Sequence, residues 1–236
     1  MSNTESGYAK NAANLKDLII RVKTLDKDYK PPKAKFEIKE LEELSKKAED
    51  ALRAVSQVLP VYSKAVDEQE LIFKPFNNLI TRSFNYLKAA ISNPAELQTA
   101  KTLADQIRGI IKNRKDTDST VSRSQKSVSY DNRVENFKQY IYVLVNSNVY
   151  TPNSEDISVK SFQALLQTME ASIIAVAIAK APVDDARKKR FTVFYAEQIG
   201  LVDIVLGVKS YIKASLKLDH PQRKHILGLT FKKVKL

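Results

Sequence analysis

The chain has 236 residues, of which 43% are hydrophobic and 28% charged, a balance that favours a folded globular protein over a disordered one. Its five glycines and eight prolines are too few for an all-β fold, and the glycines are too scattered for a phosphate-binding loop. Because there is no cysteine, disulfides, thiol nucleophiles and thiolate metal sites are excluded, while Lys and Arg (39) outnumber Asp and Glu (27) to give a net charge of +12.

Apolar residues recur at helical spacing through the first half of the chain. Leu15, Leu18 and Val22 follow the i, i+3, i+7 spacing of an amphipathic helix, which Pro31 and Pro32 then close. Pro60 suits the first turn of a helix, because the first N–H groups of a helix have no intrahelical partner. The pattern predicts five helices, at about residues 8–25, 36–59, 60–73, 76–92 and 94–112.

Residues 116–129 are rich in Ser, Thr and Asp, which bury little apolar surface, so this segment is predicted to be a linker. The helical pattern then resumes. Residues 228–236 alternate apolar and polar side chains, which leaves a short strand, an extended arm and a frayed end as alternatives. Four further helices are predicted, at about residues 130–146, 157–180, 182–198 and 200–217.

The two halves of the sequence contain the same landmarks in the same order. A Tyr-x-Pro element at Tyr29 occurs again at Tyr150, and we expect each to anchor a loop against its bundle. Because the order is kept from end to end, we interpret the halves as two copies of one helical unit. Further matches pair Ile38 with Val159, Leu41 with Phe162, Glu49 with Glu170, Pro60 with Pro182, Tyr86 with Tyr211, and Asn93-Pro94 with His220-Pro221.

These patterns predict an all-α protein made of two tandem antiparallel helical bundles related by internal duplication. The first bundle spans 1–115, the linker spans 116–129, and the second bundle, which ends in a basic C-terminal arm, spans 130–236. A continuous helical array is the alternative geometry. Two copies are few for such an array, which usually needs at least about three repeats for stability.

A search for catalytic or metal-binding residues finds no supported site. His220 and His225 are five residues apart, which is not the i, i+4 spacing of a helical zinc pair. Ser210 and Lys213 have the Ser-x-x-Lys spacing of some acyl-transfer enzymes, but the first copy has Asn85 at the position of the serine. We therefore predict a non-enzymatic protein with no cofactor and no bound metal.

Positive charge is concentrated toward the C-terminus. Residues 1–120 contain 21 Lys and Arg against 17 Asp and Glu, whereas residues 121–236 contain 18 against 10. Clusters of this kind can neutralise phosphates or contact an acidic partner, although a solvated helix face is the alternative reading. The candidate phosphate or partner contacts are Lys112, Arg114, Lys115, Arg123, Lys126, Arg187, Lys188, Lys189, Arg190, Arg223, Lys224, Lys232, Lys233 and Lys235.

The sequence also suggests a location. The N-terminus is polar, and no apolar segment of a secretory signal follows it. The longest apolar run, residues 173–179, is far shorter than the roughly 20 residues of a membrane-spanning helix, so we expect it to be a buried stretch of helix. We therefore expect no membrane span and a cytoplasmic protein.

Three short elements resemble uncharacterised all-helical duplicated proteins of Bacteroidota: the Tyr-x-Pro loops, residues 200–203 (Gly-Leu-Val-Asp), and residues 228–232 (Gly-Leu-Thr-Phe-Lys). The resemblance covers most of the chain. It implies the duplicated helical fold, but it implies no activity, cofactor or site residue.

We predict a helical binding or scaffold protein that uses its helix faces and its basic C-terminal half to bind a protein partner or a second copy of itself. The alternative is a nucleic-acid-associated accessory protein. Because no helix-turn-helix, zinc-finger or RNA-binding signature is present, such binding would be non-specific contact with the phosphate backbone.

Overall fold

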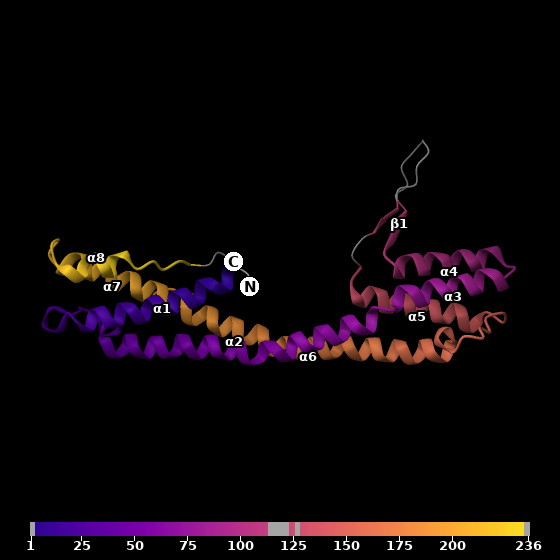
Figure 1. Ribbon diagram of the computed structural model, residues 1–236, viewed down its shortest axis with the longest axis horizontal. Helices are drawn as coiled ribbons and strands as arrows, with labels where there is room; N and C mark the ends of the chain where they lie inside the picture. Colours follow the sequence, from indigo (N-terminus) through magenta and orange to yellow (C-terminus); the bar gives the residue numbers. More distant parts are fainter. Residues whose placement is uncertain (1–2, 113–122, 126–127, 234–236) are drawn as a thin grey trace, which may run out of the picture. The chain divides into compact units, whose positions relative to one another are not determined.

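The computed structural model describes residues 3–112, 123–125 and 128–233, and helices dominate it (Figure 1). The predicted all-α class is confirmed, apart from one short hairpin. Three 3-10 helices, η1 (Asp26–Asp28), η2 (Ala34–Phe36) and η3 (Glu155–Ile157), lie in the loops. The α-helices are α1 (Asn3–Lys23), α2 (Ile38–Phe73), α3 (Phe76–Ala90), α4 (Pro94–Ile107), α5 (Tyr130–Asn146), α6 (Val159–Tyr195), α7 (Leu201–Ser215) and α8 (Pro221–Gly228).

The hairpin was not predicted. Its strands β1 (Ile110–Lys112) and β2 (Arg123–Gln125) are antiparallel, with Ile110 opposite Gln125. The helix predicted over 94–112 ends early, because Gly109 has a φ of 72°, in the left-handed region that favours glycine and ends helices. Part of the predicted linker therefore forms β2, and most of the linker lies outside the described residues.

Two predicted helix breaks at prolines are absent. α2 continues through Pro60, and α6 continues through Pro182. A proline removes one helical hydrogen bond, which leaves the carbonyl four residues earlier without its partner. Here the prolines and the residues that carry those carbonyls, Ser56 and Ile178, are exposed, so water can bond to the carbonyls instead. The helices therefore continue without leaving a buried carbonyl unpaired.

The described chain divides into two compact units that differ from the predicted boundaries of 1–115 and 130–236. Unit 1 combines residues 1–60 with 180–236, and unit 2 consists of residues 61–179. The physical reason is the continuity of α2 and α6, since each of these helices begins in one unit and ends in the other. Each unit thus contains segments from both halves of the sequence.

Unit 1 is built around α1, which contacts α7 and α8 (Figure 1). Leu15, Leu18 and Val22 are fully buried in the same apolar core as Val205 and Val208 of α7. Each such side chain contributes about 1.5–3 kcal/mol when it leaves water. The spacing that predicted an amphipathic helix therefore identified the buried face of α1.

The C-terminal arm, residues 229–233, is an extended segment that packs against α1. The side chain of Asn11 donates to the carbonyl of Lys232 (2.9 Å) and accepts from the backbone N–H of the same residue (3.3 Å). Asn14 donates to the carbonyl of Thr230 (2.7 Å). Of the three alternatives for the end of the chain, an extended arm is the one that the structure contains up to residue 233.

Unit 2 has an aromatic core between α3, α5 and α6. Phe76, Phe137 and Phe162 are fully buried. Their rings meet edge to face, with 4.7 Å between the centroids of Phe76 and Phe137 and 5.3 Å between those of Phe137 and Phe162. Aromatic pairs of this kind contribute about 0.5–1.5 kcal/mol beyond the area they bury. α4 packs against both α5 and α3.

Candidate functional site

Each Tyr-x-Pro element closes a loop in the same way, one in each unit. The hydroxyl of Tyr29 donates to the carbonyl of Phe36 (2.5 Å), and that of Tyr150 donates to the carbonyl of Ile157 (2.6 Å). Both tyrosines are buried, so each bond satisfies a phenol and a loop carbonyl together. The prediction that these tyrosines anchor loops is confirmed.

A second tyrosine packs on each anchor. Tyr211 meets Tyr29 edge-on in unit 1 (5.6 Å between centroids), and Tyr86 meets Tyr150 edge-on in unit 2 (5.4 Å). Each outer hydroxyl also bonds to the backbone of the residue after the inner tyrosine, but in opposite directions: that of Tyr211 accepts from the N–H of Lys30 (2.9 Å), and that of Tyr86 donates to the carbonyl of Thr151 (2.7 Å). The two loops therefore share the inner bond and the ring contact, and differ in the direction of the outer bond.

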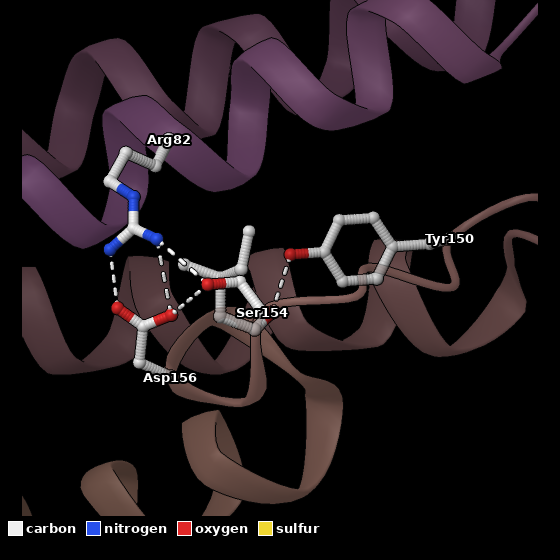
Figure 2. Close-up of polar contacts among 5 residues, drawn as sticks. Arg82, Tyr150, Ser154 and Asp156 are labelled. Carbon is white, nitrogen blue, oxygen red and sulfur yellow. Dashed lines mark hydrogen bonds and ion pairs between the residues drawn. The ribbon is translucent and has the colours of Figure 1, made fainter.

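In unit 2 the loop before α6 is also held by Arg82 of α3, as Figure 2 shows. The guanidinium forms a two-pronged ion pair with Asp156 and donates to the hydroxyl of Ser154 (2.9 Å). Hydrogen bonds from Arg82 and Ser154 hold the pKa of Asp156 below its ordinary value. Because these groups bond to one another at the surface, they fix the loop.

The buried hydroxyls of unit 2 stay protonated near neutral pH. Ser83 lies 2.7 Å from the hydroxyl of Tyr150 and 3.1 Å from that of Tyr140. Burial raises the pKa of Tyr150 to about 12 and raises the pKa of Tyr140 above its ordinary value as well. A general base needs a pKa near the operating pH, so this cluster is suited to stabilising the loop and not to proton transfer.

The basic run in α6 divides into exposed and buried residues. Arg187, Lys188 and Lys189 are exposed, and their side chains form no hydrogen bond or ion pair with any residue that the structure describes. Arg190 differs, because it is 4% exposed and its guanidinium lies 4.0 Å from the ring centroid of Tyr8. Of the four predicted contacts, the first three are available to a partner and Arg190 belongs to the core of unit 1.

The arm presents one paired and one unpaired lysine. The ammonium of Lys233 lies 3.0 Å from a carboxylate oxygen of Asp203. Hydrogen bonds from the backbone N–H of Gln198 and from Lys233 hold the pKa of Asp203 below its ordinary value. The side chain of Lys232 is exposed, although its backbone is bonded to α1. The arm therefore offers a partner less free charge than its sequence suggests.

The remaining predicted contacts do not form one cluster. In α8, Arg223 donates to a backbone carbonyl of α7 (3.4 Å) and Lys224 is exposed. Lys112 and Arg123 are cross-strand neighbours in the hairpin of unit 2. The structure thus distributes these residues over both units. Four others lie outside the described residues: Arg114, Lys115, Lys126 and Lys235.

Formal charge divides unequally between the two units. Unit 1 contains 25 Lys and Arg against 15 Asp and Glu, whereas unit 2 contains 14 against 12, so the net charges are +10 and +2. Residues 180–236 supply most of this difference, with 13 Lys and Arg against 5 Asp and Glu. The sequence pattern places the excess positive charge in residues 121–236. It does not predict that residues 121–179 belong to unit 2, which is nearly neutral.

Among the described residues, α6 is the helix that is long and apolar enough to cross a membrane by length and composition. Only 17% of its most apolar 18-residue window is buried. The expectation that residues 173–179 are buried is wrong, since Ile174 and Ile178 expose 59% and 68% of their surface. One helix of this kind also occurs in proteins that do not enter membranes, so the described residues contain no clear membrane span.

A shallow cavity of about 610 Å³ lies in unit 2, where the end of α2 meets the start of α5. The rings of Phe73 and Tyr130 line it with 4.4 Å between their centroids, and Arg133 lies across Phe73 at 5.4 Å. Burial lowers the pKa of Arg133 below its ordinary value. Sequence patterns do not predict this cavity, because its walls come from segments more than fifty residues apart.

Within the described residues, no group of three or more His, Asp or Glu could hold a metal ion. No known protein family, curated protein or solved structure matches the chain.

Proposed function

We propose that this protein is a non-enzymatic helical binding or scaffold protein whose basic unit 1 holds an acidic partner. The observation that supports this most is the net charge of +10 on unit 1 against +2 on unit 2. Three consecutive cations, Arg187, Lys188 and Lys189, are exposed and form no ion pair with any residue that the structure describes. Positive surfaces of this kind speed encounter with acidic surfaces and select against basic ones.

The polar networks support binding over catalysis. Tyr150 and Asp156 have pKa values shifted away from neutrality, so their protonation states do not change near pH 7. Each also has its hydrogen bonds committed to a loop. We include a cytoplasmic location in the proposal, which the absence of cysteine supports.

We further propose that two copies of one unit, related by internal duplication, build the protein. The matched loop bonds of Tyr29 and Tyr150 support this. So do the helix starts of α4 and α8, where the side chains of Asn93 and His220 each accept from the N–H two residues later, at 3.0 and 3.2 Å. In this proposal the copies are interleaved, since each compact unit contains the first part of one copy and the last part of the other.

Binding of a fluorescent poly-glutamate peptide, followed by anisotropy at low and moderate salt, tests the proposal. The variant R187A/K188A/K189A removes the exposed run from unit 1. Three exposed charge pairs at about 0.5 kcal/mol each correspond to a loss of about tenfold in affinity. The matched control is K88A/K138A/K160A, which removes three exposed unit 2 cations that form no ion pair among the described residues.

We expect the control to bind within about twofold of the unaltered protein, because its charges lie outside unit 1. An equal loss in both variants would mean that net charge alone attracts the peptide. Absence of binding at low salt would contradict the proposal altogether.

The alternative function is non-specific association with nucleic acid, which is favoured by the run of three exposed cations on α6 that form no ion pair among the described residues. The logarithm of the affinity for duplex DNA falls with the logarithm of the salt concentration, with a slope of about −0.9 for each phosphate contacted. A gel-shift titration with generic DNA and RNA should then show a slope that R187A/K188A/K189A reduces by up to about three. Tighter binding to DNA or RNA than to poly-glutamate at one salt concentration would select this alternative, and no binding at low salt would reject it.

A further inference from the structure

The end of α2 presents an apolar residue between side chains of opposite charge. Leu71 is 66% exposed. Asp67 and Glu70 precede it and Lys74 follows it, and their spacings of three and four residues bring all of them to one face of the helix. The three charged side chains are exposed and form no ion pair with any residue in the described part of the chain. The charges on this face are therefore free to pair with another molecule.

The neighbouring cavity completes this face. Leu71 and Tyr130 both line the cavity, and Arg133 adds a second cation to the lining besides Lys74. The guanidinium of Arg133 is held in position, because it donates to the carbonyl of Ile107 (3.1 Å) and to the side chain of Asn77 (2.6 Å). The positive end of the face is thus fixed before any partner arrives.

We propose that this face of unit 2, formed by Asp67, Glu70, Leu71, Lys74 and Arg133 and called here the α2 face, binds a second copy of the chain about a two-fold axis. Asp67 lies four residues before Leu71 and Lys74 three residues after it, which is about 6 Å and about 4.5 Å along the helix. An axis near Leu71 therefore brings the acidic end of one copy against the basic end of the other.

A two-fold interface uses the same patch on both subunits, so the patch must be complementary to itself. The α2 face meets this condition, because the carboxylates of Asp67 and Glu70 precede Leu71 along the helix and the cation of Lys74 follows it, with Arg133 as the second cation of the lining. The cavity beside Tyr130 receives Leu71 of the second copy. A polyanion or an acidic partner is a poorer fit, because the α2 face has no net charge. The inference is independent of the proposed function, which uses unit 1.

Sedimentation velocity of the full-length protein over a range of concentrations tests the dimer. At about 20 mM salt, where charges act over about 20 Å, we expect a monomer–dimer equilibrium that weakens as salt is added. The variants D67K/E70K and K74E each place like charges opposite one another, so each should raise the dimer dissociation constant at least about tenfold. The control K160E reverses an exposed charge of α6 that forms no ion pair among the described residues, and it should leave dimerisation unchanged.

Mixing the two interface variants gives the sharpest test. D67K/E70K and K74E restore opposite charges across the interface when they meet, so an equimolar mixture should form heterodimers where each variant alone stays monomeric. Circular dichroism checks that each variant is folded. A chain that stays monomeric up to about 500 µM at low salt, well above typical micromolar contacts, would overturn the proposal. A dimer that D67K/E70K does not weaken, or a mixture that does not associate, would overturn it as well.

Discussion

Replacing Tyr150 with phenylalanine tests whether the loop anchor stabilises unit 2. The tyrosine hydroxyl has one proton, which it donates to the carbonyl of Ile157 at 2.6 Å, so Ser83 at 2.7 Å acts as the donor in the second bond. Without the hydroxyl, Ser83 can still bond to Tyr140 at 3.1 Å, whereas the carbonyl of Ile157 loses its partner. An unsatisfied buried acceptor costs about 1–3 kcal/mol, and because one group is affected we expect a loss of about 1–2 kcal/mol.

Urea denaturation followed by circular dichroism measures this loss. Tyr29→Phe removes the matching bond in unit 1 and should lower the free energy of unfolding by about the same amount, because the carbonyl of Phe36 also loses its hydrogen-bond partner. Tyr142→Phe is the control, because Tyr142 is 58% exposed, and it should change the free energy of unfolding by less than about 0.5 kcal/mol. If Tyr150→Phe had no larger effect than the control, the loop bond would contribute nothing and the anchor argument would be refuted.

Three further substitutions test other contacts by thermal or urea denaturation. Gly207→Ala should destabilise unit 1 by about 1–3 kcal/mol, because the added Cβ would overlap the ring of Phe36; a gain in stability would contradict this packing. Asn93→Ala should cost about 1 kcal/mol, since it removes the N-cap of α4, and an unchanged midpoint would argue against the cap. The pKa of Asp203 is lowered by the N–H of Gln198 and by the ammonium of Lys233. Its carboxylate therefore stabilises the fold above the unfolded pKa of about 3.9, and this stabilisation is lost as the pH falls through the folded pKa. Asp203→Asn should therefore lower the melting temperature at pH 7, and the difference should shrink below about pH 4; a difference independent of pH would refute the assignment.

Periodicity predicted the helices well because each buried face is encoded locally. The spacing of Leu15, Leu18 and Val22 lies on the core side of α1, and the Asn93-Pro94 pair starts α4 as capping rules require. Tyr29 and Tyr150 were identified as loop anchors from their shared sequence context alone. In each case the deciding interactions lie within a few residues of one another or on one helix face.

The division into units was not predicted, because it depends on interactions that sequence patterns do not encode. Pro60 and Pro182 suggested helix starts, yet both helices continue and carry the chain from one unit into the other. The candidate site shows the same limit. Arg190 reads as one of four equivalent cations, but in the structure it is buried in unit 1 and lies against Tyr8, more than 180 residues away.

Under the proposed duplication, the two loops show how one framework supports two different surfaces. In unit 1 the small Gly207 allows the ring of Phe36 to pack directly on α7. In unit 2 the matching positions hold Arg82 and the smaller Ile157, and Arg82 forms its ion pair with Asp156 at the surface of the loop. Phe36 with Gly207 in unit 1 and Ile157 with Arg82 in unit 2 are therefore two ways to pack the same loop. Replacing one residue of either pair with its counterpart from the other unit should destabilise that unit. The tyrosine anchors fix the loop in both solutions, which leaves the surrounding charges free to differ and allows unit 1 to become strongly basic while unit 2 stays nearly neutral.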